Sequence, residues 1–326
     1  MDNFRAVIEV LKWASPRDTL KNASIVTRRW QEVSDSEELW RHFLPPDSDP
    51  QGAASKLYFH ANFTNSVFVV LPNKLLRYYV TPGTWSESSL SQRIAIETNV
   101  SVTRVSEDSL LVIGAKSAHA NTLKVNIHTG EVEVMPELSP HRGWIGVISI
   151  EGVTYAFCGE TSAGALQNCN TFSLATLTWT DIHRAGQKRS RFTPCAAASS
   201  IYLLGSNSRN PLPGEVYDRL SGRFNPLHFS LPYDSCISIV HDGTLLVISP
   251  DEVFTKPIGS SKAGQTTPLK KTLFGDVSSG YDPLICGDYV YFLQREFSRV
   301  VKFTLSTKKW TGYGYKGEKT HYCLKK

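Results

Sequence analysis

A short apolar strand recurs six times along this chain, at intervals of about 43 to 47 residues. A polar turn precedes five of the copies, as at Glu151-Gly152, and a further apolar or small-residue run precedes the turn. A third and a fourth run follow most copies, so each repeat predicts four strands. Helical periodicity is absent after about residue 45, which excludes two-helix solenoid repeats. The six copies are Phe68-Val69-Val70, Leu111-Val112-Ile113, Tyr155-Ala156-Phe157, Tyr202-Leu203-Leu204, Leu246-Val247-Ile248 and Tyr291-Phe292-Leu293.

One four-stranded sheet of this size cannot bury both of its faces, but six sheets arranged radially can. We therefore predict an all-β six-bladed β-propeller over residues 56–326; the alternative is a β-sandwich or several unrelated β domains. The fifth blade has the weakest pattern, because a Gly/Ser/Lys segment stands where its fourth strand is expected. Residues 316–326 are a candidate closing strand. The expected blades cover about residues 56–90, 97–138, 143–182, 191–231, 235–275 and 281–315.

The first 46 residues have a different pattern, which predicts a small all-α domain of three helices. Ser15-Pro16-Arg17-Asp18 supplies a capping hydroxyl, a proline at the first helical position and an acid in the first turn. A unit this small builds little core of its own, so it is expected to pack on a partner or on the propeller. Residues 47–55 form the linker between the two domains.

The composition of the sequence limits the partners and the cellular compartment expected for this chain. The formal net charge is +5, too diffuse to indicate nucleic acid, and no apolar run is long enough for a membrane span. The six cysteines form no C-x-x-C pair, which argues against a disulfide framework or a zinc site. The first residues do not have the pattern of a secretory signal. We therefore expect a reducing compartment, the cytoplasm and/or the nucleus.

Binding is expected on the propeller face where the loops between second and third strands meet the loops between blades. Basic residues outnumber acidic ones in these loops, which include Arg184, Arg191 and the acid Glu160. Because Arg pairs bidentately with carboxylate and phosphate, the expected ligand is an acidic or phosphorylated protein segment; the alternative is that these charges are merely solvated. The residues chosen for this face are His119, Arg142, Arg189, Arg209 and Arg295.

Catalytic motifs are absent from the sequence. No G-x-S-x-G, H-E-x-x-H or P-loop is present, and no pattern of metal ligands occurs. We therefore predict no catalytic residue, metal site or cofactor, although a propeller enzyme such as a lyase or glycosidase remains the third alternative for this chain.

Two stretches resemble known families. Tyr155-Ala156-Phe157-Cys158-Gly159-Glu160 is similar to the kelch repeat, in which an aromatic strand ends in a glycine pair and an aromatic residue follows on an outer strand. The other copies are degenerate in the glycine pair but keep an outer aromatic, at Trp85, Trp179, Phe224 and Trp310. The N-terminal segment resembles the F-box through Val10–Leu20, Ile25–Trp30 and Glu38–Arg41, without the family's Leu-Pro opening and with Ala14 at a position usually larger.

The two resemblances together imply a function. In such proteins an F-box binds the Skp-type adaptor of a cullin–RING ubiquitin ligase, and the propeller holds the protein to be ubiquitylated. The resemblance implies that Leu11, Leu20, Val26 and Trp30 face or support the adaptor. The alternatives are a kelch interaction scaffold that recruits no adaptor, and a helical cap in which these residues are ordinary core.

Overall fold

The structure is a computed structural model, and it describes residues 66–80, 84–94, 100–106, 108–114, 122–205, 212–231, 236–249, 252–260, 264–269, 283–294 and 299–314. The expected N-terminal helices, the linker and the closing strand lie outside these residues. So do Leu11, Leu20, Val26 and Trp30 of the expected adaptor surface.

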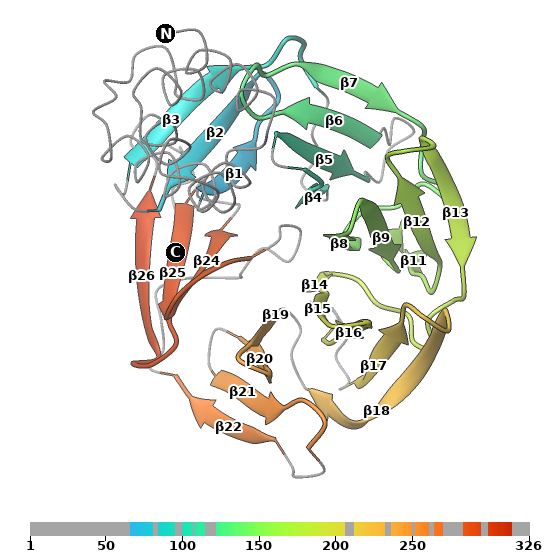
Figure 1. The fold of residues 1–326 in the computed structure, drawn as a ribbon, viewed down its shortest axis with the longest axis vertical. Helices are drawn as coiled ribbons and strands as arrows, with labels where there is room; N and C mark the ends of the chain where they lie inside the picture. The colour runs from blue at the N-terminus through green and yellow to red at the C-terminus, as the bar shows by residue number, and fades with distance from the viewer. Residues whose placement is uncertain are drawn as a thin grey trace, which may run out of the picture. The chain divides into compact units, whose positions relative to one another are not determined.

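The described residues form an all-β fold with six blades in a propeller arrangement, and they contain no helix (Figure 1). The six-bladed, all-β prediction is therefore confirmed. The first blade has three strands: β1 (Ser66–Val70), β2 (Lys74–Tyr79) and β3 (Thr84–Ser89). The second has four: β4 (Ser101–Arg104), β5 (Ser109–Ile113), β6 (Thr122–Asn126) and β7 (Val132–Met135).

The third blade pairs β8 (Gly146–Ile150), β9 (Val153–Phe157), β12 (Cys169–Ser173) and β13 (Thr178–Ile182), with a small hairpin, β10 (Glu160–Thr161) and β11 (Gly164–Ala165), inserted between β9 and β12. The fourth pairs β15 (Cys195–Ala197), β16 (Ser200–Leu203), β17 (Leu212–Asp218) and β18 (Arg223–Leu231). The fifth contains β19 (Cys236–His241), β20 (Thr244–Ile248), β21 (Glu252–Pro257) and β22 (Gln265–Pro268). The sixth contains β23 (Leu284–Cys286), β24 (Tyr289–Gln294), β25 (Arg299–Thr304) and β26 (Lys309–Gly314).

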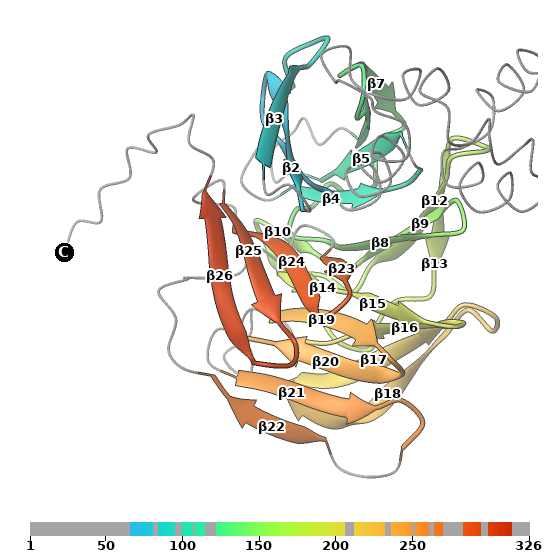
Figure 2. The ribbon, with the colours of Figure 1, turned by 60° about the vertical axis from the view of Figure 1, so that its left-hand side comes forward.

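By its contacts the chain divides into two compact units, and the second, residues 69–76 and 87–326, contains the second to sixth blades complete. Within this unit the core consists of apolar layers between neighbouring blades. Leu111 and Ile113 of β5 pack with Val147 of β8, and Val253 of β21 packs with Phe303 of β25. Figure 2 shows the sheets β19–β22 and β23–β26 next to each other. Because inner strands touch a blade on each side, they are apolar on both faces, as the short continuous runs in the sequence indicate.

Two features of the fold depart from the sequence reading. The fifth blade has a fourth strand, β22, paired with β21 from Glu252↔Pro268 to Thr255↔Gln265. The two-residue strand β14 (Phe192–Thr193), expected within the fourth blade, instead pairs in parallel with β19 of the fifth. The segment leading into the fourth blade therefore also completes the inner edge of the next blade.

Candidate functional site

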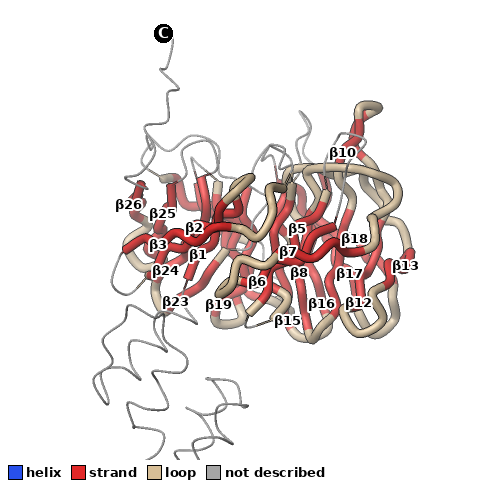
Figure 3. The backbone as a smooth tube through the Cα atoms, turned by 90° about the horizontal axis from the view of Figure 1, so that it is seen from above, coloured by secondary structure: helices blue, strands red, loops and turns tan. Residues whose placement is uncertain are grey.

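The third and fourth blades present a set of described loops at one end of their strands. We call residues 136–145, 158–168 and 183–191 the loop face; they precede β8, follow β9 and precede β14, respectively. The hairpin β10–β11 stands out beyond the ends of the neighbouring strands on this side (Figure 3). Backbone hydrogen bonds join Gly143 and Glu160 in both directions, at 2.9 and 2.8 Å, and Arg189 N donates to Leu166 O at 3.2 Å. The three loops thus form one hydrogen-bonded surface.

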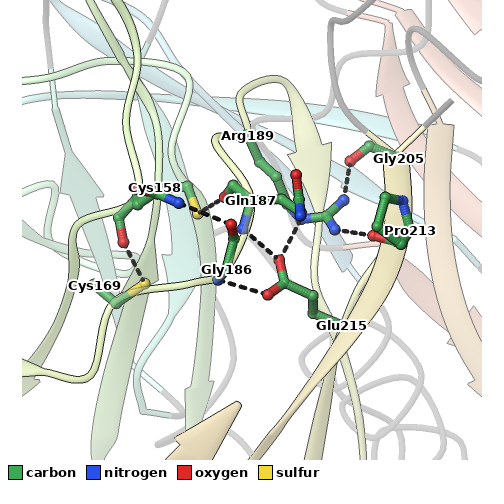
Figure 4. Close-up of polar contacts among 9 residues, drawn as sticks. Cys158, Cys169, Gly186, Gln187, Arg189, Gly205, Pro213 and Glu215 are labelled. Atoms are coloured by element: carbon green, nitrogen blue, oxygen red, sulfur yellow. Dashed lines mark hydrogen bonds and ion pairs between the residues drawn. The ribbon is translucent and has the colours of Figure 1, made fainter. Parts of the chain in front are cut away.

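Arg189 fastens the third of these loops to the fourth blade (Figure 4). Its fully buried guanidinium donates from Nε to Glu215 Oε2 at 3.2 Å and from Nη1 to Gly205 O at 3.0 Å, and from Nη2 to Pro213 O. Glu215, in β17, also accepts hydrogen bonds from the backbone N–H groups of Gly186 and Gln187. The hydrogen-bond partners of Arg189 and Glu215 named above all lie on the loop or on the fourth blade. The buried pair therefore holds the loop in one conformation.

In the preceding repeat, Arg142 fastens the loop before β8 to the third blade in the same way. Its buried guanidinium donates to Cys158 O at 2.6 Å, to Pro140 O at 3.1 Å and to Asn170 Oδ1 at 2.6 Å. Burial lowers the pKa of Arg142 to about 10, and the nearby cysteines and Asp181 oppose this shift. Arg142 is therefore still charged at neutral pH, and it ties the loop before β8 to the ends of β9 and β12.

These positions correct the sequence reading. Arg142 and Arg189 were expected on an open loop face, but both side chains are fully buried. The reason is that backbone carbonyls at the strand ends need donors, and a long arginine reaches several of them at once. His119, Arg209 and Arg295 lie outside the described residues. Of the five residues chosen for this face, the structure describes two, Arg142 and Arg189, and both are supports beneath the surface.

Three of the partly exposed side chains of the loop face, Trp144, Arg191 and Glu160, lie close to one another. The guanidinium carbon of Arg191 lies 4.3 Å from the centre of the Trp144 ring, and Arg191 N donates to Trp144 O at 3.2 Å. Arg191 Nε is 4.0 Å from Glu160 Oε2. Sequence reasoning counted Arg191 and Glu160 among the charged loop residues but missed Trp144. The signal that could have found it is its position: Trp144 and Arg191 each follow one of the buried arginines by two residues.

The backbone at this pair is unusual. Trp144 has φ 53° and Arg191 has φ 58°, in the left-handed region that bulky residues rarely adopt. Such conformations persist only where the surrounding structure imposes them, and they cluster at binding and catalytic sites. Here each of the two residues follows, by two positions, an arginine that is fully buried and hydrogen-bonded. The repeated geometry therefore holds Trp144 and Arg191 in contact.

Arg191 is placed to bind an anion. Its side chain is 39% exposed, and within the described part of the chain neither of its terminal nitrogens has a hydrogen-bond partner. Stacking on Trp144 orients the guanidinium plane before any ligand arrives. Arg184 and Lys188, both exposed, add positive charge from the same loop. This arrangement favours a carboxylate or a phosphate group.

Among the described residues, no group of three or more His, Cys, Asp and Glu side chains is close enough to hold a metal ion. The same residues include no helix with the length and apolar character of a membrane span. In comparisons with known proteins, no family model and no curated protein matches the sequence.

Proposed function

We propose that this chain is the substrate-recognition subunit of an SCF-type cullin–RING ubiquitin ligase. The N-terminal 46 residues would recruit a Skp-type adaptor and, through it, the cullin, and the propeller would hold the target protein, in the cytoplasm and/or the nucleus. The observation that carries the proposal is the order of the two parts: a segment with F-box spacing from Val10 to Arg41 precedes a six-bladed propeller. The chain itself would perform no chemistry.

Target binding is assigned to the loop face. Its loops are fixed by the buried clamps of Arg142 and Arg189, so binding a target would cost little ordering of the backbone. Arg191, stacked on Trp144, would pair with a carboxylate or phosphate of the target, and Arg184 and Lys188 would attract acidic segments. The target is therefore expected to present an acidic or phosphorylated segment.

The adaptor half of the proposal is tested by affinity isolation of the full chain from cells. We expect an adaptor and a cullin to co-purify. Leu11→Asp and Val26→Asp each place a charge on the expected adaptor surface and should abolish co-purification while acidic-peptide binding by the same protein persists. Isolation of the intact chain without adaptor or cullin would overturn the ligase assignment.

The target half is tested separately, by binding of an acidic peptide pool at low and high salt. Arg191→Ala should lower retention, and Arg191→Lys should restore it only in part because a lysine lacks the guanidinium fork. Arg223→Ala is the matched control, since Arg223 is an exposed arginine at the start of β18, outside the loop face. Equal retention by the Arg191→Ala and wild-type proteins would refute this assignment.

The differences between the N-terminal segment and the F-box pattern favour a second function. The Leu-Pro opening is absent, and Ala14 stands where a larger apolar residue is usual in the family. If these changes remove adaptor binding, the protein is an interaction scaffold that uses the same loop face. Peptide binding without adaptor co-purification would identify the scaffold.

A further inference from the structure

Glu160 lies beside Arg191 at the site assigned to target binding. Its Oε2 is 4.0 Å from Arg191 Nε, and the Glu160 and Arg191 side chains are 19% and 39% exposed. Arg191 Nε is buried and donates no hydrogen bond within the described part of the chain. At this distance the two groups attract each other as charges, but they are too far apart for an N–H···O hydrogen bond. Glu160 therefore offsets part of the Arg191 charge without occupying the terminal nitrogens of the guanidinium.

The backbone of Glu160 is held in place by the neighbouring loops. Glu160 and Gly143 exchange both of their backbone hydrogen bonds, at 2.8 and 2.9 Å, and Gly159 N–H donates to Arg189 O at 2.9 Å. The close approach at Gly159 requires glycine, because its φ is 106° and a Cβ atom there would lie 2.9 Å from Gly143 O. These contacts keep Glu160 at its place, so its carboxylate cannot withdraw far from a ligand bound to Arg191.

The Arg191 guanidinium offers a ligand its two terminal nitrogens. Trp144 covers one face of the group, with the guanidinium carbon 4.3 Å from the ring centre, and Glu160 lies next to Nε. Among the described residues, none accepts a hydrogen bond from the terminal nitrogens. Their spacing suits two oxygens of a carboxylate and two oxygens of a phosphate equally. Shape therefore does not separate these two anions at Arg191.

The two anions differ in charge. A carboxylate carries one negative charge, whereas a phosphate monoester carries about −1.5 to −2 at pH 7. An anion bound to Arg191 is repelled by Glu160, and this repulsion increases with the charge of the anion. The extra charge of a phosphate is thus attracted by Arg191 but repelled by Glu160. The phosphate therefore gains little over a carboxylate at this site.

We propose that Glu160 determines the specificity of the loop face, which takes the carboxylate of an Asp or Glu side chain rather than a phosphate. This inference rests on the proposed function, because it names the anion that the face accepts from the target. The bound segment of the target is then acidic by its own sequence, and it needs no phosphorylation to be recognised.

The preference is measured on the full chain with two fluorescently labelled peptides. Both consist of Gly, Ser and Asp residues and differ at one position, which is glutamate in the first peptide and phosphoserine in the second. Dissociation constants are measured by fluorescence anisotropy at neutral pH and at one ionic strength, because salt screens the charges. We expect the wild type to bind the glutamate peptide at least as tightly as the phosphoserine peptide.

Glu160→Gln should change that preference. It removes the repulsion, so both peptides should bind more tightly and the phosphoserine peptide should gain more. We expect the ratio of the two dissociation constants to shift toward phosphoserine by about five-fold, the size expected for one extra charge a few Å from another in a water-like medium. Glu137→Gln is the matched control, because Glu137 is an exposed acid of the same loop face that pairs with His141 at 3.7 Å. It removes the same charge and should leave the ratio at the wild-type value.

Three outcomes would overturn the inference: tighter binding of the phosphoserine peptide by the wild type, the same ratio in the wild type and Glu160→Gln, or an equal shift in Glu137→Gln. The first of these needs no substitution, so a Glu160 variant that fails to fold still leaves a decisive measurement.

Arg191→Ala separates this inference from the proposed function. It should weaken the binding of both peptides. If it does so while Glu160→Gln leaves the ratio unchanged, the loop face binds the target but Glu160 sets no preference. If Arg191→Ala changes the binding of neither peptide, the target site lies elsewhere and both assignments fail.

Discussion

Arg191 stacks on Trp144, 4.3 Å from the ring centre, and both residues hold a left-handed backbone. Each is two residues past a buried arginine whose hydrogen bonds tie its loop to the ends of neighbouring strands. The stack therefore lies next to two clamps that occupy equivalent positions in successive repeats. Its half-exposed guanidinium is the part of the loop face that we assign to target binding.

At position 191, a glycine variant should be more stable than an alanine variant, because the backbone of Arg191 is left-handed. A left-handed residue other than glycine costs roughly 1–2 kcal/mol, and an exposed cation–π contact contributes about 0.5–1 kcal/mol. Arg191→Ala keeps the backbone cost and loses the contact, whereas Arg191→Gly loses both. We expect Arg191→Gly to be the more stable by about 1 kcal/mol in urea denaturation, with acidic-peptide binding weakened in both.

Leu177 provides the control for that experiment. It has φ 52°, is exposed, and lies in the turn between β12 and β13. Leu177→Gly should likewise be more stable than Leu177→Ala, while peptide binding stays at the wild-type level. The same order at Leu177 but not at Arg191 would mean that the Arg191 backbone is not strained in solution.

Glu215→Gln should be strongly destabilising. Glu215 is 5% exposed and pairs with the fully buried Arg189, so the substitution leaves a buried charge without its counter-charge. Breaking a buried pair in this way typically costs about 3–5 kcal/mol. In urea denaturation, Glu151→Gln is the matched control: Glu151 is 78% exposed in its ion pair with Arg219, and such surface pairs contribute about 0–1 kcal/mol. Similar losses for the two variants would contradict the clamp.

Asp108 should make stability depend on pH in the acidic range. A hydrogen bond from Ser106 lowers the pKa of Asp108, partial burial opposes the shift, and a hydrogen bond from Ser109 adds to it. A carboxyl group whose pKa is depressed in the folded state stabilises the fold above its unfolded pKa, about 3.9, and this stabilisation is lost as the pH falls through the folded value.

The test compares wild type and Asp108→Asn by urea denaturation at neutral pH and at successively lower pH. The wild type should be the more stable at neutral pH, and the difference should shrink below about pH 4. Ser106→Ala removes the main hydrogen bond and should reduce the same pH-dependent part. A difference that is constant with pH would show that Asp108 contributes through packing instead.

Gly146→Ala should be destabilising because of Phe192. A Cβ atom at residue 146, in β8, would lie 2.5 Å from the buried Phe192 ring of β14. Overpacking of this kind costs about 1–3 kcal/mol. Phe192→Leu reduces the clash, so the double variant should lose less stability than the sum of the single variants, as measured by thermal or urea denaturation. Additive losses would mean that the two residues are not in contact.

Much of the fold was predictable from the sequence because it depends on local pattern. Short apolar runs recur at one period, and sheets with two apolar faces must stack, so six blades follow. The weak fifth blade was harder. Its β22 consists of exposed Gln, Thr and Pro residues, and backbone pairing rather than apolar burial defines it. The N-terminal domain and its adaptor residues stay predictions.

The sequence by itself determined the all-β repeat, its blade count and the basic character of the loops. Only the tertiary structure decided which of those loop residues are exposed. Arg142 and Arg191 look alike in the sequence, but the carbonyl oxygens that bury Arg142 come partly from Cys158, beyond the next hairpin. The contact of Arg191 with Trp144 likewise joins segments distant in the chain. Such contacts depend on how the blades stack, and no local pattern encodes them.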